Sequence, residues 1–182
     1  MAVDWTAQLL EQLTFHWDNH VRPRLDGLTD DEYFWEPVEG CWSIRPRAEA
    51  AAPIAAGAGD YVAEFEIPEP DPAPFTTIAW RLGHVIVGVL AMRVAGHFGG
   101  PPVDYVTHHY AATAREALEQ LDDAYAAWTA GVRETDLEAP CGPSEGPYAD
   151  APMALLVLHI NRELLHHGAE IALLLDLHRA RV

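Results

Sequence analysis

Glu163 and His167 lie four residues apart in a leucine-rich segment, and this spacing can bring a carboxylate and an imidazole to one metal ion. Residues four apart lie one above the other on the same face of an α-helix. Glu170 falls close to the same line on a helical wheel, and a charged group on such a face needs an oppositely charged partner or a metal. A single Glu–His pair of this spacing is common on solvated helix faces. A metal site is therefore indicated only if another segment supplies a further ligand.

His84 is the third ligand that the sequence offers. Its neighbours on one face of a predicted helix are Trp80, Val87 and Ala91, so its imidazole is expected to face the core. Such a histidine taken alone is more often a hydrogen-bonded core residue. Two imidazole nitrogens and one carboxylate from two helices would, however, form an open metal site with free positions for water or substrate. We expect zinc at this site, and nickel and iron are alternatives.

Four further histidines are candidates for supporting roles. His159 and His166 flank Glu163 on the same helix, so either can orient Glu163 or lie in the outer shell of the metal. His166 becomes an alternative ligand if the helix is rotated. His16 and His20 have the same four-residue spacing in the first helix. They either line the same pocket, bind a second ion, or form a polar helix face.

The segment 41–45 (CWSIR) is expected to lie over the mouth of the bundle. Trp42 is either a packing anchor or a pocket residue. Arg45 and Arg81 can each bind a carboxylate of a substrate or cofactor in a bidentate manner, or pair with the many acids of the chain itself. Cys41 has no adjacent basic partner in sequence, so we do not expect it to act as a nucleophile.

Apolar periodicity predicts four long helices, at 4–25, 75–97, 107–131 and 153–179. Together they would form an all-α, up-and-down four-helix bundle that positions the candidate residues. A long irregular connection, 37–74, joins the first two and is rich in proline, alanine and glycine. Within it, 61–67 alternates and can form a short strand. The last helix is apolar on most sides, which suggests a central position or an oligomer contact. We expect residues 1–182 to form a single domain.

The composition excludes several classes of protein. The chain has 28 acidic residues, 11 basic residues that are all arginine, and a formal net charge of −17. Phosphate backbones and anionic membranes repel such a chain, so no nucleic-acid or membrane partner is expected. Without lysine, no Schiff-base or P-loop lysine is possible. No unbroken apolar run reaches about 18 residues and no basic leader is seen, so we expect neither a membrane span nor a signal peptide. Two cysteines fit reduced thiols in the cytoplasm.

The chain resembles the DinB-like (YfiT-like) four-helix bundle superfamily in three places: 22–33 (RPRLDGLTDDEY), 40–45 (GCWSIR), and 80–84 (WRLGH) paired with 163–170 (ELLHHGAE). The usual metal set of that family is one histidine on the second helix and His-x-x-x-His on the fourth. Glu163 stands at the first of these two later positions, which resembles the mycothiol-dependent maleylpyruvate isomerase branch with its His, Glu, His zinc site. Carried over residue by residue, the resemblance implies His84, Glu163 and His167 as ligands.

The resemblance also implies a function. The superfamily includes bacillithiol- and mycothiol-dependent transferases, so we expect a divalent-metal-dependent enzyme that transfers a low-molecular-weight thiol to an electrophilic small molecule. Members often dimerise, and a homodimer is expected here. The isomerase has an additional C-terminal domain, so maleylpyruvate isomerisation itself is not expected of this chain. A non-catalytic, stress-related binding bundle and a metal-dependent hydrolase are the alternatives, because the same ligands serve hydrolysis and thiol transfer.

Overall fold

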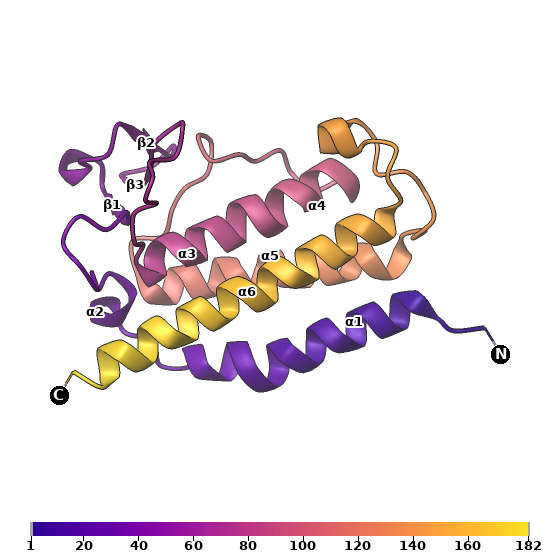
Figure 1. Ribbon diagram of the computed structural model, residues 1–182, viewed down its shortest axis with the longest axis horizontal. Coiled ribbons are helices and arrows are strands. Elements are labelled where there is room, and N and C mark those ends of the chain that lie inside the picture. The colour runs from indigo at the N-terminus through magenta and orange to yellow at the C-terminus, as the bar shows by residue number, and fades with distance from the viewer. Residues whose placement is uncertain (1, 182) are drawn as a thin grey trace.

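Four long helices form most of the computed structural model, which describes residues 2–181 (Figure 1). Their segments are α1 (Trp5–His16) with a π-helical turn (Trp17–Val21) and a 3₁₀ turn (Arg22–Leu25); α3 (Ile78–His84), a π-helical stretch (Val85–Ala91) and α4 (Met92–His97) in one continuous helix; α5 (Ala114–Glu134); and α6 (Met153–Arg179). Shorter helical turns are α2 (Asp30–Tyr33), Arg47–Glu49 and Pro143–Tyr148. The expected all-α bundle is confirmed.

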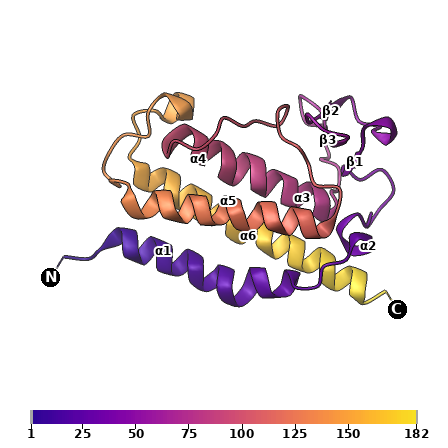
Figure 2. The same ribbon diagram turned by 180° about the vertical axis from the view of Figure 1, so that it is seen from behind.

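The order of helix directions differs from the expected up-and-down arrangement. The helix made of α3 and α4 runs in the same direction as α5, while α1 and α6 run the opposite way (Figures 1 and 2). This happens because residues 98–113 return along the length of the bundle instead of making a tight turn. The returning segment brings side chains from the middle of the chain back to the outside of α3.

The start of the third long helix was expected near Thr107, and that expectation is wrong. Thr107 is held in a local turn, where its hydroxyl donates to the Asp104 carboxylate at 2.9 Å and its backbone N–H binds the same oxygen at 2.7 Å. The helix begins instead after Thr113, whose hydroxyl accepts from the backbone N–H of Glu116 at 3.2 Å. Threonine is a favourable N-cap residue, and Thr113 fills this position because Thr107 is held in the Asp104 turn.

The connection between the first two long helices is not irregular throughout. It holds a small antiparallel sheet of β1 (Ile44–Pro46), β2 (Ile54–Ala56) and β3 (Tyr61–Phe65), with β3 in the centre. Ala63 pairs with Ile44 on one side and with Ala56 on the other. The strand expected within 61–67 is therefore confirmed. The sheet lies at one end of the bundle, beside the start of α3 (Figure 1).

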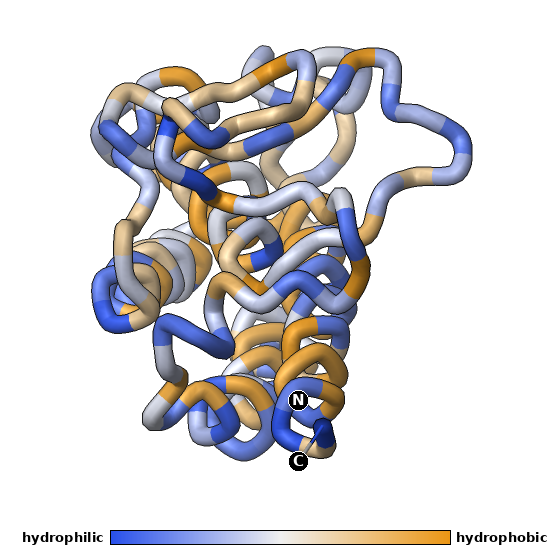
Figure 3. The backbone as a smooth tube through the Cα atoms, turned by 90° about the vertical axis from the view of Figure 1, so that its left-hand side faces the viewer, coloured by the Kyte–Doolittle hydropathy of each residue, from blue (hydrophilic) through white to orange (hydrophobic). Residues whose placement is uncertain are grey.

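The core lies between the four long helices, along which hydrophobic and hydrophilic residues alternate (Figure 3). Its largest fully buried members include Trp128 on α5, Leu13 on α1, Leu82 on α3 and Leu175 on α6. Each such side chain contributes roughly 1.5–3 kcal/mol to folding through burial. The core fixes the four helices rigidly enough to hold side chains from α3 and α6 face to face.

Two of the long helices are strongly apolar. Ile78–His97 is long and apolar enough to cross a membrane by length and composition, but 56% of its most apolar stretch is buried in the bundle, as in the core helix of a soluble protein. The last helix, α6, is not buried on all sides within the chain. It leaves one face of leucines 42–60% exposed, namely Leu155, Leu158, Leu165, Leu173 and Leu177.

Candidate metal centre

His84 on α3 and His167 on α6 face each other across the interface of these two helices. Their ring centroids are 4.8 Å apart and the rings are nearly perpendicular, at 85°. The side chain of His167 is only 8% exposed, and His84 is half-buried with its ring stacked on Trp80 at 5.6 Å. Two residues 83 positions apart in the chain are thus brought within reach of one small ion.

The two nitrogens of His167 have different partners. Nδ1 lies 2.7 Å from a carboxylate oxygen of Glu170, which itself pairs with the guanidinium of Arg81 at 3.1 Å. Nε2 lies 3.5 Å from an oxygen of Glu163. Because a carboxylate only accepts hydrogen bonds, the Nδ1–H group donates to Glu170, and Nε2, which faces Glu163, is the nitrogen available to a metal. A histidine held in this way by a carboxylate is the usual arrangement of a metal ligand.

His84 is held by a tyrosine. Its Nδ1 lies 2.9 Å from the hydroxyl of Tyr105, and within residues 2–181 its Nε2 makes no hydrogen bond. Tyr105 can approach because residue 88, one turn further along the helix, is glycine; a Cβ atom there would lie 1.8 Å from the tyrosine oxygen. Burial, followed by the nearby His167 and Arg81, lowers the pKa of His84 to about 4. His84 is therefore neutral at pH 7, as metal coordination requires.

Glu163 is shared between His167 and a second pair of residues. Its other oxygen accepts from the Arg162 guanidinium at 3.0 Å and lies 3.4 Å from Nδ1 of His159. Burial raises the pKa of the Glu163 carboxyl, but hydrogen bonds from Arg162 and the charges of His159 and His167 outweigh burial, and its pKa is lowered overall. Glu163 is consequently an ionised oxygen donor at neutral pH.

A second, overlapping group of donors lies on α6 alone. Within the described residues 2–181, His166, His167 and Glu170 form the group whose donor atoms all lie within 4.8 Å of one another. This group can hold a metal ion. The predicted set of His84, Glu163 and His167 does not meet this 4.8 Å spacing, and its Glu163 carboxylate also contacts Arg162 and His159. The two sets share His167, and the predicted ligand set stays a prediction.

The sequence profile of the DinB superfamily matches residues 12–171, which include part or all of each long helix and every donor described above. The chain belongs to the DinB superfamily. No curated protein and no solved structure was found to match it. Membership, together with the histidine and glutamate donors between α3 and α6, supports a metal-binding DinB protein.

The remaining candidates in this DinB protein lie in different places. The ring of His16 is 5.7 Å from that of His20, and buried Nε2 of His16 has no hydrogen-bond partner within residues 2–181. Burial, followed by the charge of His20, lowers the pKa of His16. Trp42 is buried beside Trp80 with ring centroids 6.2 Å apart.

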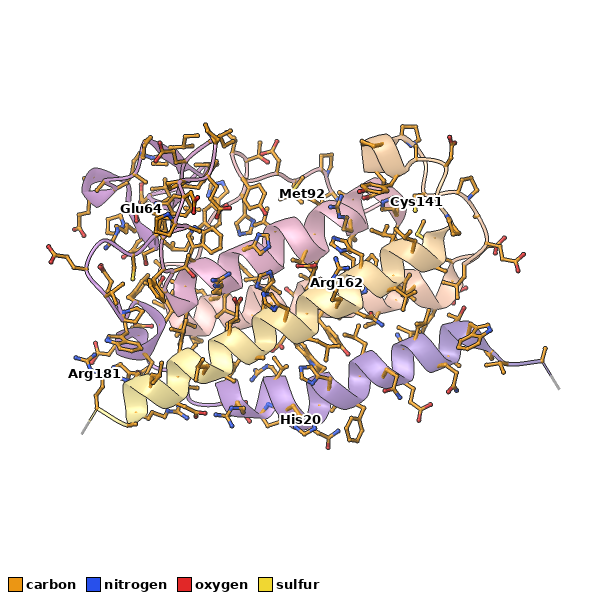
Figure 4. The ribbon with its side chains drawn as sticks, in the orientation of Figure 1. His20, Glu64, Met92, Cys141, Arg162 and Arg181 are labelled. Atoms are coloured by element: carbon orange, nitrogen blue, oxygen red, sulfur yellow. The ribbon has the colours of Figure 1, made fainter. Side chains whose placement is uncertain are left out.

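The two arginines considered for substrate binding both have carboxylate partners within the chain. Arg45 binds Glu64 and Glu36, each at 2.7 Å, and Arg81 binds Glu170. Figure 4 places Glu64 within the small sheet and Arg162 on the middle of α6, far apart along the bundle. The two cationic groups on the His84 side of the centre are therefore already paired.

Sequence patterns did not reveal the pocket that opens beside His84. It has a volume of about 210 Å³ and lies between the sheet, α3 and the returning segment 98–113; its lining is Trp42, Ala63, Phe65, Glu66, Glu69, Trp80, His84, Tyr105 and Tyr110. Gly88 was the one local signal for Tyr105, because a glycine inside a helix often marks a close approach. Trp80 was expected on the same helix face as His84 and Trp42 was a possible pocket residue, but nothing in the local sequence linked the remaining lining residues to His84.

Proposed function

We propose that this DinB protein is a divalent-metal-dependent enzyme that transfers a low-molecular-weight thiol, of the mycothiol or bacillithiol type, to an electrophilic small molecule. The main support is the pair of facing imidazoles from α3 and α6, whose ring centroids are 4.8 Å apart, with a Glu163 oxygen 3.5 Å from Nε2 of His167. Nitrogen and oxygen donors of this kind suit zinc, and nickel and iron are alternatives. Because all 11 basic residues are arginine, the chain has no lysine that could activate a nucleophile.

His84, Glu163 and His167 would hold the ion, and their donor atoms fit the task. The free nitrogen of each imidazole and the ionised carboxylate offer three ligands with one negative charge, which leaves net positive charge on a divalent ion. Bound there, the metal would lower the pKa of a coordinated thiol and so supply a thiolate near neutral pH. Glu170, which pairs with Arg81, fixes the tautomer of His167, and Tyr105 holds the ring of His84 in place.

A larger cavity offers room for the thiol. It has a volume of about 800 Å³ and is lined by His159 and Arg162, the two residues that also contact Glu163, together with Arg93 on α4. The rest of its lining is mainly apolar and includes Leu155, Leu156 and Leu158, so the cavity offers a sugar thiol both apolar surface and hydrogen-bonding groups next to a metal ligand. We propose that the thiol binds on this side of the centre and the electrophile on the side of His84. We also propose that the protein is cytoplasmic.

Tyr105→Phe is expected to lower zinc affinity about tenfold, because an outer partner of a metal-bound histidine typically contributes about 10–100-fold. The variant removes only the hydroxyl that lies 2.9 Å from His84. Zinc affinity would be measured by competition with a chromophoric chelator, and Tyr148→Phe, an exposed tyrosine, is the control. Equal affinities in the wild type and Tyr105→Phe would show that Tyr105 does not position His84.

Thiol transfer is tested by turnover. Purified protein is incubated with mycothiol or bacillithiol and a panel of electrophiles, before and after removal of metal with a chelator. We expect consumption of thiol that the chelator abolishes and added zinc restores. Hydrolysis of the electrophile without loss of thiol would favour a metal-dependent hydrolase instead. Ligand binding without any chelator-sensitive turnover would favour a non-catalytic binding bundle.

A further inference from the structure

The pocket beside His84 is walled mainly by aromatic rings from three separate parts of the chain. Trp42 precedes β1, Phe65 ends β3, Trp80 lies on α3, and Tyr105 and Tyr110 come from the returning segment. Trp42 and Trp80 have ring centroids 6.2 Å apart, and those of Phe65 and Tyr105 are 6.3 Å apart. These rings line a space of about 210 Å³.

Two rings of this pocket are held by hydrogen bonds, and two others are buried. The indole N–H of Trp80 donates to the backbone oxygen of Glu64 at 2.7 Å, and the Tyr105 hydroxyl is held at His84. Tyr110 and Trp42 are buried, with less than a tenth of their surface exposed. A pocket with walls held in this way is formed before any ligand arrives, so a ligand does not pay to order it.

The charges at this pocket are all negative. Glu66 and Glu69 line it, and within residues 2–181 neither forms an ion pair. No arginine lines it. Arg45 and Arg81, the nearest candidates in sequence, are bound to Glu64, Glu36 and Glu170. The Arg81 guanidinium lies 5.6 Å from the centroid of the Trp80 ring, but Glu170 balances its charge. A ligand with a carboxylate would therefore meet two like charges and no unpaired counter-charge, whereas a cation would meet both carboxylates and the aromatic lining.

We propose that this pocket, formed by Trp42, Phe65, Trp80, Tyr105 and Tyr110 with Glu66 and Glu69, binds a small organic cation that carries an ammonium group on an apolar or aromatic body. The apolar body packs among the rings and reaches His84, while the ammonium group lies at the two glutamates. The role of such a cation as the substrate rests on the metal-dependent function proposed above. Its binding to the pocket does not depend on that function.

The size of the pocket limits the ligand further. Sites for drug-sized ligands occupy about 300–1,000 Å³. A volume of about 210 Å³ therefore admits a single substituted ring or a short branched chain, but not a sugar-linked thiol. The substrate class is thus small aromatic or aliphatic electrophiles that also carry an ammonium group, and dicarboxylic acids are excluded by charge.

Three probes of equal size and different charge test this inference: benzylammonium, benzyl alcohol and benzoate. Binding to the full chain is followed by quenching of tryptophan fluorescence and by calorimetry at neutral pH. We expect benzylammonium to bind most tightly, benzyl alcohol more weakly and benzoate least. In the double variant Glu66→Gln/Glu69→Gln, benzylammonium is expected to bind about fivefold more weakly, while benzyl alcohol is unaffected. Glu138→Gln, an exposed glutamate distant in sequence, is the matched control.

Each alternative result overturns the proposal. Equal or tighter binding of benzoate would show that the pocket does not select cations, and no binding of any probe would show that it is not a ligand site. Unchanged benzylammonium affinity in the double variant would remove the role of the two glutamates. The titrations are run on chelator-treated and on zinc-loaded protein. A failure to take up zinc then counts against the proposed function alone, whereas loss of the charge preference counts against the cation pocket alone.

Discussion

Replacing His167 by alanine is expected to abolish stoichiometric zinc binding, with a loss in affinity of more than about 100-fold. Loss of an outer partner alone costs about 10–100-fold, and His167 is a ligand in both sets of donors that the structure brings together. It is also the most buried donor, with 8% of its side chain exposed, so no neighbour can take its place without moving a helix. Elemental analysis of protein purified without an affinity tag measures the effect.

His109→Ala is the matched control, because His109 is an exposed histidine outside the centre. It is expected to leave zinc content unchanged. Two further variants separate the two ligand sets. We expect His84→Ala to lose zinc and His166→Ala, at a side chain 62% exposed, to keep it. The opposite result would assign the ion to His166, His167 and Glu170, and equal zinc in all variants would remove the centre altogether.

The long helices could be predicted from the sequence because each carries a stripe of large apolar residues at helical spacing. Leu121 and Trp128 on α5, for example, are seven residues apart and both end in the core. The relation between Glu163 and His167 was predictable for the same reason, since a helix converts a four-residue spacing into a distance without any tertiary information. Helix directions were not, because the crossover of residues 98–113 has no periodic pattern.

The parts of the site that come from the connections could not be predicted. The strands β1 and β2 have three residues each, too short for an alternating pattern to stand out, and β1 pairs with a strand about 18 residues further along the chain. The contact of Tyr105 with His84 depends on Gly88 and on a segment that closes over it from outside the helix. Each of these features is a pairing of residues that only the folded chain brings together.

Arg45→Met is expected to lower the free energy of unfolding by about 3 kcal/mol, or the Tm by about 6–12 °C. Arg45 is the cationic partner of Glu64, whose side chain is 2% exposed in the centre of the small sheet. The two oxygens of Glu64 also accept from the backbone N–H groups of Ser43 at 3.1 Å and Ala51 at 2.8 Å. Without Arg45, a buried carboxylate keeps its desolvation cost and loses its counter-charge.

The matched control is Arg115→Met, which breaks an exposed arginine–glutamate pair on α5. Arg115 lies 2.6 Å from Glu119, with 71% and 62% of the two side chains exposed. Such surface pairs contribute about 0–1 kcal/mol, so the control is expected to change stability by less than about 1 kcal/mol. Chemical denaturation followed by circular dichroism measures both variants. Similar small losses in the two would show that the Arg45–Glu64 pair does not hold the sheet.

The pH dependence of the same difference isolates the charge of Glu64. Burial raises the pKa of this carboxyl, but the Ala51 N–H, Arg45 and the Ser43 N–H outweigh burial and lower its pKa overall. Since the folded pKa lies below the unfolded value of about 4.3, the ionised carboxylate stabilises the fold above that pH. This stabilisation is lost as the pH falls through the folded pKa. The gap in stability between wild type and Arg45→Met should therefore be full at neutral pH and narrow toward about pH 3. Parallel curves over that range would mean that packing of the arginine side chain, and not its charge, secures the sheet beside the pocket.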